Sequence, residues 1–184
     1  MDNNFNKNFS LSNMFKARNG EFLIEHLLQK LDYKVYRFGY ETALQNIFNL
    51  GIKLKNNDTK EMINFMPDFL VIDPKGEMTL IEVKLRTNIT NVLVEGRIKE
   101  KAERIKKYYP ECLLVIVDGE ECNPIKACYV KDYNSLKDLK PFRDLLFDSK
   151  KEENLEIIKE VEDLAKDFVK RNKLNEKNET PKDE

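Results

Sequence analysis

The sequence predicts an α/β fold with a central mixed sheet of four to five strands flanked by helices. Segments with apolar residues at helical spacing occur near both ends of the 184-residue chain and in its middle. Between them lie two strand-like segments joined by the turn "DPKGE" and the wholly apolar run "CLLVIV". A run of that kind is typical of a strand buried on both faces. Strands and helices interleaved in this way indicate one mixed α/β domain.

The N-terminal half is expected to contain two helices and three strands. Residues 1–16 are expected to form a flexible arm, and the helix that follows ends at Asp32. "YKVYRF" predicts the first strand. Residues 39–62 form an insertion, in which "ETALQNIFNLGI" predicts a helix ending at Gly51 and "KLKNNDTK" predicts a polar loop. The core face of the first helix is predicted to hold Ile24, Leu27, Leu28 and Leu31.

The C-terminal half is expected to place helices around a buried strand. "NVLVEGRIKEKAERIKKYY" predicts a helix that Pro110 stops, and "CLLVIVDG" and "IKACYVKDY" predict strands. Extra C-terminal helices are expected over residues 136–170, from "LKDLKPFRDLLF" and "EENLEIIKEVEDLAKDFVKR". Residues 171–184 are polar and are expected to be disordered. The domain therefore spans residues 17–170.

Composition and short motifs restrict the classes of function that are compatible with the sequence. No apolar run approaches the ~20 residues of a membrane span, and the N-terminus lacks the pattern of a secretory signal, so a cytoplasmic protein is expected. The three cysteines match no zinc spacing, and the single histidine, His26, has no acidic or nucleophilic motif around it. The net charge is −1, but residues 1–110 carry 18 basic and 14 acidic residues, whereas residues 111–184 carry 14 and 19. An anionic partner is therefore expected at the N-terminal part.

The turn "DPKGE" sets the register of the two strands around it. Its proline suits position i+1 of a type I turn, and Gly76 suits the left-handed residue of a three-residue hairpin loop. Asp73 then pairs with Glu77, and counting back along both strands pairs Asp68 with Glu82. A two-residue loop would shift this register by one residue.

In that register Asp68, Glu82 and Lys84 share one face of the sheet. The two carboxylates would lie with Cβ atoms about 4.5–5.5 Å apart, where like charges repel. A divalent cation bound between the two carboxylates would turn this repulsion into attraction. Mg²⁺ suits the position, because it takes one or two carboxylates and several waters as ligands. Solvated surface charge is the alternative interpretation, but the neighbours "FLVI" and "MTLIEV" indicate core strands.

"PD" at residues 67–68, thirteen further residues and "EVK" at residues 82–84 resemble the signature of the PD-(D/E)XK nuclease superfamily. The resemblance covers residues 17–130 and leaves out the insertion and the C-terminal helices. It implies a restriction-endonuclease-like core that cleaves nucleic-acid phosphodiesters with Mg²⁺, or with Mn²⁺ as a substitute. DNA is the implied partner, and double-strand cleavage by this class makes a homodimer an expectation.

The opening helix is similar to that of archaeal Holliday-junction resolvases and small bacterial relatives. In those proteins a glutamate precedes the aromatic residue of the first strand by about twelve residues, and Glu21 and Tyr33 have this separation. On a helical wheel Glu21 lies about 80° from the centre of the apolar face, and Glu25 lies about 120° away on the solvent side. Gly20 would allow a close approach at the start of the helix. Glu21 is therefore the glutamate expected to serve the site.

The resemblance implies a hydrolytic site built on these residues. Asp68 and Glu82, with a backbone carbonyl of the same strand, would hold one or two Mg²⁺ ions, and Glu21 would complete the shell through a water. Lys84 would orient or deprotonate the attacking water, or neutralise the developing charge. These alternatives stay open.

Arg97, Lys101 and Arg104 are expected to contact DNA phosphates from the helix face opposite its apolar stripe. Interleaved glutamates are equally typical of a solvated helix. Further basic or polar candidates flank the site: Lys16, Arg18, Arg37, Arg86 and Thr87.

Three functions are compatible with the sequence. The first is a metal-dependent nuclease, and specifically an endonuclease acting on DNA. The second is a catalytically silent nucleic-acid-binding or scaffolding protein on the same fold. The third is an unrelated α/β protein that docks partners on the helix over residues 152–170. The presence of Asp68, Glu82 and Lys84 together favours the first.

Overall fold

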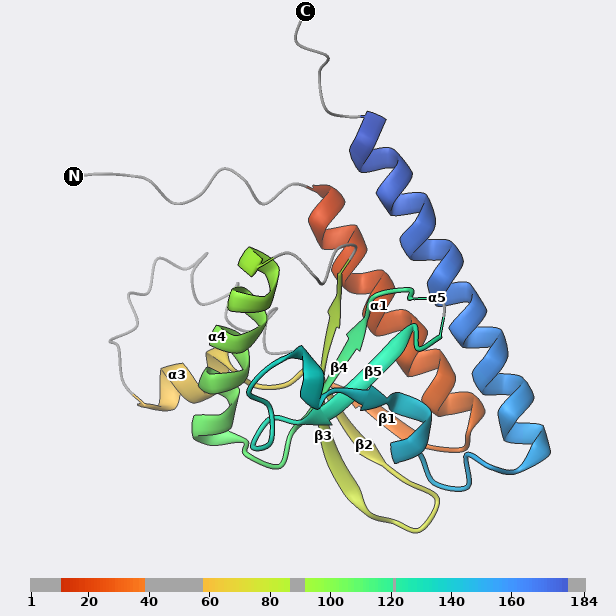
Figure 1. The fold of residues 1–184 in the computed structure, drawn as a ribbon. Helices are drawn as coiled ribbons and strands as arrows, with labels where there is room; N and C mark the ends of the chain where they lie inside the picture. Colours follow the sequence, from red (N-terminus) through yellow and green to blue (C-terminus); the bar gives the residue numbers. More distant parts are fainter. Residues whose placement is uncertain (1–10, 39–57, 87–91, 121, 179–184) are drawn as a thin grey trace, which may run out of the picture.

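A computed structural model describes residues 11–38, 58–86, 92–120 and 122–178, with side chains from residue 18 to residue 172 of these ranges. A six-stranded sheet in the order β1 to β6 forms its centre, and helices lie on both faces (Figure 1). The strands are β1 (Lys34–Arg37), β2 (Phe69–Ile72), β3 (Met78–Leu85), β4 (Leu113–Val117), β5 (Ile125–Tyr129) and β6 (Lys140–Pro141). The helices are α1 (Leu11–Lys30), α3 (Asp58–Asn64), α4 (Val92–Tyr108) and α5 (Glu152–Asn178), with 3₁₀ turns η1 (Leu136–Asp138) and η2 (Phe142–Leu145).

The hairpin of β2 and β3 has the predicted register. Ile72 pairs with Met78 and Phe69 pairs with Ile81. The same count sets Asp68 opposite Glu82, beyond the end of β2. A slip of one residue would move these side chains to the other face of the sheet.

Backbone and side-chain hydrogen bonds hold the turn of this hairpin. Gly76 has a φ of 89°, the left-handed conformation that a side chain disfavours. Asp73 Oδ1 accepts the backbone N–H groups of Lys75 and Glu77, both at 2.8 Å. The Asp73 N–H donates to the Glu77 carbonyl at 2.9 Å, which closes the loop in the predicted pairing.

The sheet is mixed because β3 and β4 run parallel while every other pair is antiparallel. Helix α4 makes the crossover between these parallel strands (Figure 1). All five residues of β4 are buried, as the apolar run predicted.

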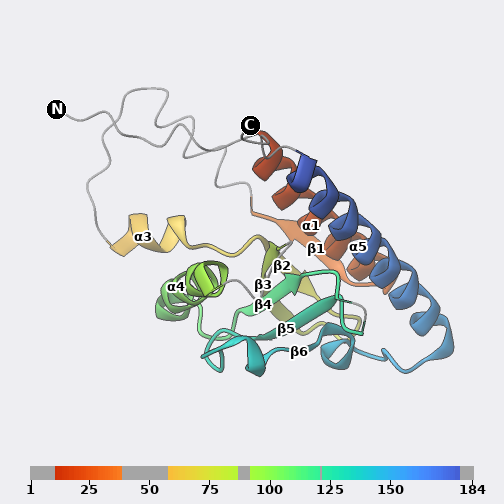
Figure 2. The ribbon, with the colours of Figure 1, turned by 45° about the horizontal axis from the view of Figure 1, so that its top comes forward.

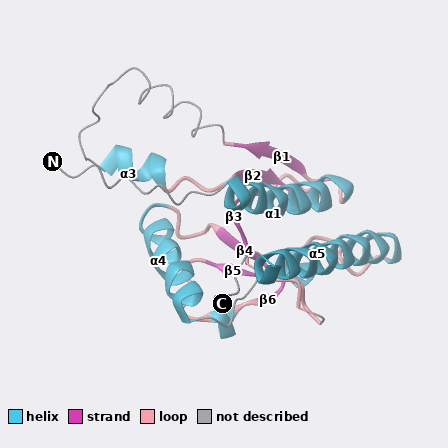
Figure 3. Ribbon diagram, turned by 90° about the horizontal axis from the view of Figure 1, so that it is seen from above, coloured by secondary structure: helices cyan, strands magenta, loops and turns pink. Residues whose placement is uncertain are grey.

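Two hydrophobic cores lie on opposite faces of the sheet. Helices α1 and α5 cover one face and α4 covers the other (Figures 2 and 3). The alternation of β3 sends its odd-numbered residues into the α1/α5 core and leaves Glu82 and Lys84 on the α4 side. The predicted core residues of α1 are all buried in the first of these cores: Ile24, Leu27, Leu28 and Leu31.

The helical boundaries differ from the prediction at both ends of the chain. Helix α1 begins at Leu11, so residues 11–16 are helical and do not belong to an arm. Helix α5 continues through Asn178, beyond residue 171 where the disordered tail was expected to begin. Polar composition concealed these turns, because periodic apolar residues are the signal that marks a helix in sequence.

Residues 136–147 do not form the expected helix. They make two 3₁₀ turns around the short strand β6, which brings the strand count to six. Pro141 explains the difference, since it lacks an N–H donor and clashes with the preceding helical turn. Ser135 caps η1 by accepting the N–H of Lys137.

The insertion at residues 39–62 is described only from residue 58. Helix α3 begins at Asp58, inside the predicted polar loop, and the helix predicted to end at Gly51 lies outside the described residues. Among the described helices, none has the length and apolar composition required to cross a membrane.

Candidate active site

The predicted carboxylate pair lies on the sheet face that α4 covers. Strand β3 carries Glu82 and Lys84, and Asp68 directly precedes β2 in the neighbouring position. Glu82 is only 1% exposed. The hairpin register and the alternation of β3 therefore bring together the three residues of the predicted motif.

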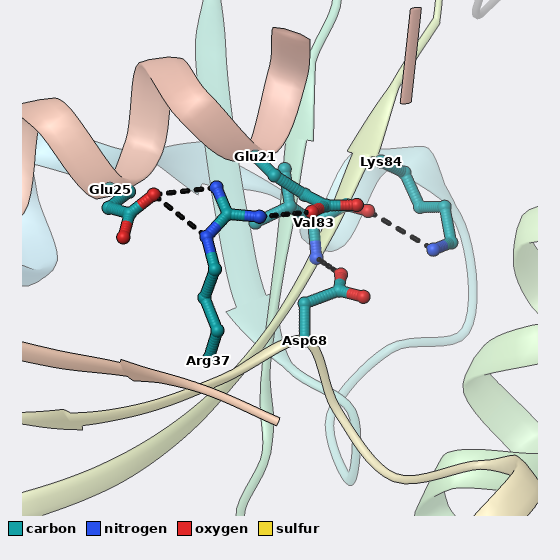
Figure 4. Close-up of polar contacts among 6 residues, drawn as sticks. All are labelled: Glu21, Glu25, Arg37, Asp68, Val83 and Lys84. Carbon is teal, nitrogen blue, oxygen red and sulfur yellow. Dashed lines mark hydrogen bonds and ion pairs between the residues drawn. The ribbon is translucent and has the colours of Figure 1, made fainter. Parts of the chain in front are cut away.

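Asp68 is held by the backbone of the opposite strand. Its Oδ2 accepts the Val83 N–H at 2.7 Å (Figure 4). Burial raises the pKa of Asp68 to about 7, with a further increase from the charge of Glu82. Lys84 and the Val83 N–H act in the opposite direction but only partly offset these effects. The two acids therefore repel each other in the way that the sequence predicted.

Glu82 faces two lysines from different elements. Its Oε1 forms ion pairs with Lys84 of β3 and with Lys101 of α4, the latter at 3.3 Å. Neither carboxylate oxygen accepts a well-aligned hydrogen bond from the described part of the chain. A buried carboxylate left in that state is costly, and the two ammonium groups offset part of that cost.

The ammonium group of Lys84 has two described contacts. Besides pairing with Glu82, its Nζ donates to the Val83 carbonyl at 3.1 Å (Figure 4). Burial by itself lowers the pKa of Lys84, but the carboxylates of Glu82 and Asp68 outweigh burial and raise the pKa. Lys84 is therefore protonated at neutral pH in the metal-free site.

Glu21 and Glu25 share one partner, Arg37 of β1. The guanidinium donates to Glu21 Oε2 at 2.9 Å and to Glu25 Oε2 at 2.9 and 2.6 Å (Figure 4). Their side chains are equally buried, at 22% and 21% exposed, so the expectation that Glu25 lies on the solvent side is wrong. The edge strand β1 draws both glutamates inward through this ion pair. The charge of Glu21 also contributes to the raised pKa of Asp68, after burial and the charge of Glu82.

The basic residues of α4 do not share one solvent-facing surface. Arg97 is exposed, Arg104 pairs with Glu100 and lies over the Phe65 ring at 5.3 Å, and Lys101 reaches Glu82. Relative to the buried residues of α4, Lys101 lies about 60° from the centre and the two arginines about 100–120° away. The same helical-wheel argument that was applied to Glu21 would have placed Lys101 at the margin of the core.

The other predicted basic contacts have varied positions. Arg86 continues the face of Lys84, and its Nη1 donates to the Leu85 carbonyl at 2.8 Å. Burial lowers the pKa of Arg86, and the nearby charge of Arg97 lowers it further, against an opposing effect of Glu82. Arg18 is exposed on α1. The side chain of Lys16 and the whole of Thr87 lie outside the described residues.

The donor set suits a hard divalent cation. Asp68 supplies a half-buried carboxylate and Glu82 a buried one, and the Oε2 of Glu82 has no partner in the described chain. Mg²⁺ commonly takes one or two carboxylates and completes its shell with water. Among the described residues no three acidic, histidine or cysteine side chains gather closely enough to hold a metal together, so Glu21 as a third ligand stays a prediction.

Comparison of the chain with protein-family models, with curated proteins and with solved structures gave no significant match. The function is therefore inferred from the geometry of the site.

Proposed function

We propose that this protein is a metal-dependent nuclease that hydrolyses DNA phosphodiester bonds. The observation that supports the proposal most strongly is the pairing of half-buried Asp68 with buried Glu82, with Lys84 on the same face of a hairpin. Keeping two acids together in a largely apolar environment opposes folding. Binding of a divalent cation and a phosphate would offset this repulsion, which explains why the two acids lie together.

The roles of the residues follow from their positions. Asp68 and Glu82 would hold Mg²⁺, which lowers the pKa of a bound water and stabilises negative charge on the phosphate. Asp68 is kept in place by the Val83 N–H. In the metal-free site Lys84 is protonated at neutral pH, and in that state it would present a positive charge to the phosphate.

The proposal extends the resemblance to the PD-(D/E)XK nucleases that the motif suggested. The order of helix, hairpin, crossover helix and buried strand supports that fold. The alternative of a protein that docks partners on α5 is less favoured, because the apolar stripe of this helix is largely used in the α1/α5 core. Its buried residues there are Ile158, Val161, Ala165 and Val169.

Cleavage assays with metal-loaded protein test the proposal. Labelled linear, nicked, branched and single-stranded DNA would be incubated with the chain and Mg²⁺ or Mn²⁺. We expect cleavage of at least one form, and its loss in Asp68→Asn and Lys84→Ala. Glu77→Gln is a matched control, since Glu77 is an exposed acid at the far end of the same hairpin.

Thermal unfolding of each variant separates chemistry from folding. Loss of cleavage with an intact unfolding transition supports the site. If the wild-type chain binds DNA in a salt-dependent way but cleaves none of the four forms, the catalytically silent nucleic-acid-binding function replaces the nuclease.

A further inference from the structure

The inward position of Lys101 assigns it a function that is distinct from that of the other basic residues of α4. Its Nζ lies 3.3 Å from Glu82 Oε1, and its side chain is 26% exposed. No acidic residue of α4 itself pairs with it among the described contacts. The side chain of Lys101 extends from α4 to the carboxylate of Glu82 in the sheet. Its ammonium group therefore occupies part of the space where a metal would bind.

Lys101 is held less firmly than Lys84. Lys84 shares the strand of Glu82 and has a second contact with the Val83 carbonyl at 3.1 Å. Lys101 reaches Glu82 from another element, and its other described contact is the Phe65 ring at 5.5 Å from the centroid. A cation–π contact of this kind is weak at a partly exposed site. Of the two ammonium groups, Lys101 is the one that can move away.

Glu82 is already paired with two ammonium groups, Lys84 and Lys101, without any bound ion. A divalent cation that binds beside Glu82 adds positive charge to a position that already holds two cations, whereas a cation that arrives with a phosphodiester brings its own compensation. The metal-free cluster therefore disfavours binding of metal alone.

We propose that Lys101 is a displaceable counter-ion that couples metal binding to DNA binding. In the free protein it occupies the cation position beside Glu82. When a divalent cation binds there, Lys101 is released and contacts the phosphate. This inference rests on the proposed nuclease site and adds a regulation of that site, because the coupling makes metal and DNA raise each other's affinity.

Metal titration of the free protein tests the first half. Mn²⁺ affinity would be measured by calorimetry for the metal-free full chain. Lys101→Met keeps the aliphatic stem but removes the competing charge, so we expect it to bind Mn²⁺ about tenfold more tightly than wild type. Lys101→Arg keeps the charge and should resemble wild type. Lys99→Met is the matched control, since Lys99 is an exposed lysine of the same helix.

Equal Mn²⁺ affinity in wild type and Lys101→Met overturns the inference and leaves the nuclease proposal standing. Absence of Mn²⁺ binding in every variant overturns the metal site itself, and the inference with it. Asp68→Asn identifies the site, because a signal that survives this substitution comes from elsewhere and counts as absence of binding.

Fluorescence anisotropy with a short duplex oligonucleotide tests the second half. Ca²⁺ serves as the metal, because its looser shell permits binding with little turnover. Ca²⁺ should strengthen duplex binding by wild type and by Lys99→Met severalfold more than by Lys101→Met. Equal strengthening in all three proteins overturns the release of Lys101 to the phosphate.

Discussion

Asp68 carries an electrostatic cost in the folded protein. In the metal-free protein, burial and the charge of Glu82 raise its pKa to about 7, compared with about 3.9 in an unfolded chain. A carboxyl group whose pKa is raised on folding stabilises the fold below its unfolded pKa. That contribution is lost as the pH rises through the folded pKa. The stability of the metal-free chain should therefore fall between about pH 4 and pH 7 on account of Asp68.

Substitution Asp68→Asn should remove this part of the pH dependence. The amide oxygen still accepts the Val83 N–H but carries no charge. With EDTA present, the melting temperature of Asp68→Asn should exceed that of wild type increasingly as the pH rises from 5 to 8. The gain should be about 2–4 °C for each kcal/mol of repulsion removed. A constant difference across that pH range would show that Asp68 does not titrate there.

We predict that Glu21 and Glu25 differ in function although they share Arg37. Because the charge of Glu21 contributes to the raised pKa of Asp68, Glu21→Gln should lower turnover strongly or raise the Mg²⁺ requirement. Glu25→Gln should leave turnover unchanged and lower stability by no more than about 1 kcal/mol, since it removes one part of a half-exposed ion pair. Steady-state cleavage rates across a Mg²⁺ series measure the first effect and denaturant titration the second. Equal loss of turnover in both variants would show that the glutamates act only by holding Arg37.

The hairpin of β2 and β3 is the element that the sequence predicted best. A proline and a glycine at fixed positions of a five-residue turn determined the loop, and the loop determined which residues pair. Local chemistry was sufficient because every determinant lies within a few residues. The position of Lys101 depends on how α4 packs across the sheet. That packing is set by distant residues, and the predicted apolar stripe of Val94, Ile98, Ala102 and Ile105 indicated only its direction.

Helix α1 packs closely at Gly20 against β3, the strand that carries Glu82 and Lys84. A Cβ added at Gly20 would lie 2.8 Å from the Leu85 Cβ, which is closer than the two atoms can pack. The expected close approach is present, but in the interior of α1 rather than at its start. Gly20→Ala must therefore push α1 from β3 and should destabilise the fold by about 1–3 kcal/mol.

Gly96→Ala is a control for Gly20→Ala, because it should change the stability of the protein in the opposite direction. It lies in α4 with no atom within 4 Å of an added Cβ. Gly96→Ala should stabilise the protein by up to about 1 kcal/mol, because alanine loses less backbone entropy in a helix. Urea titration of both variants measures the difference. Stabilisation by Gly20→Ala similar to that by Gly96→Ala would contradict the close packing of α1 on β3.

At the scale of the whole molecule, the sequence predicted the α/β class and the order of most elements. The edges of the fold were missed: strand β6, helix α3 and the ends of α1 and α5. Edge elements have weak periodicity because they bury little apolar surface of their own. Central elements such as β4 can be recognised in the sequence by a continuous run of apolar residues.

The distribution of charge over the two faces of the sheet leads to the last prediction. The protein has a net charge of −1, so the proposed binding of a polyanion would require a local basic surface. On the α4 face, the exposed Arg97 lies near the half-buried Arg86, and an anion bound there would relieve the repulsion between these two like charges. The α1/α5 face carries Arg143, which pairs with Glu162 at 3.5 Å. DNA should therefore approach from the side of α4.

The salt dependence of duplex binding distinguishes the two faces. If Arg97 contacts one phosphate, Arg97→Ala should reduce the slope of log affinity against log salt concentration by about 0.9. Arg104→Ala should change the slope less, because its guanidinium is already engaged by Glu100 and Phe65. Arg143→Ala, on the opposite face, should leave the slope unchanged. A larger effect of Arg143→Ala than of Arg97→Ala would place DNA on the α1/α5 face, away from the carboxylate pair, and would remove the structural basis for cleavage there.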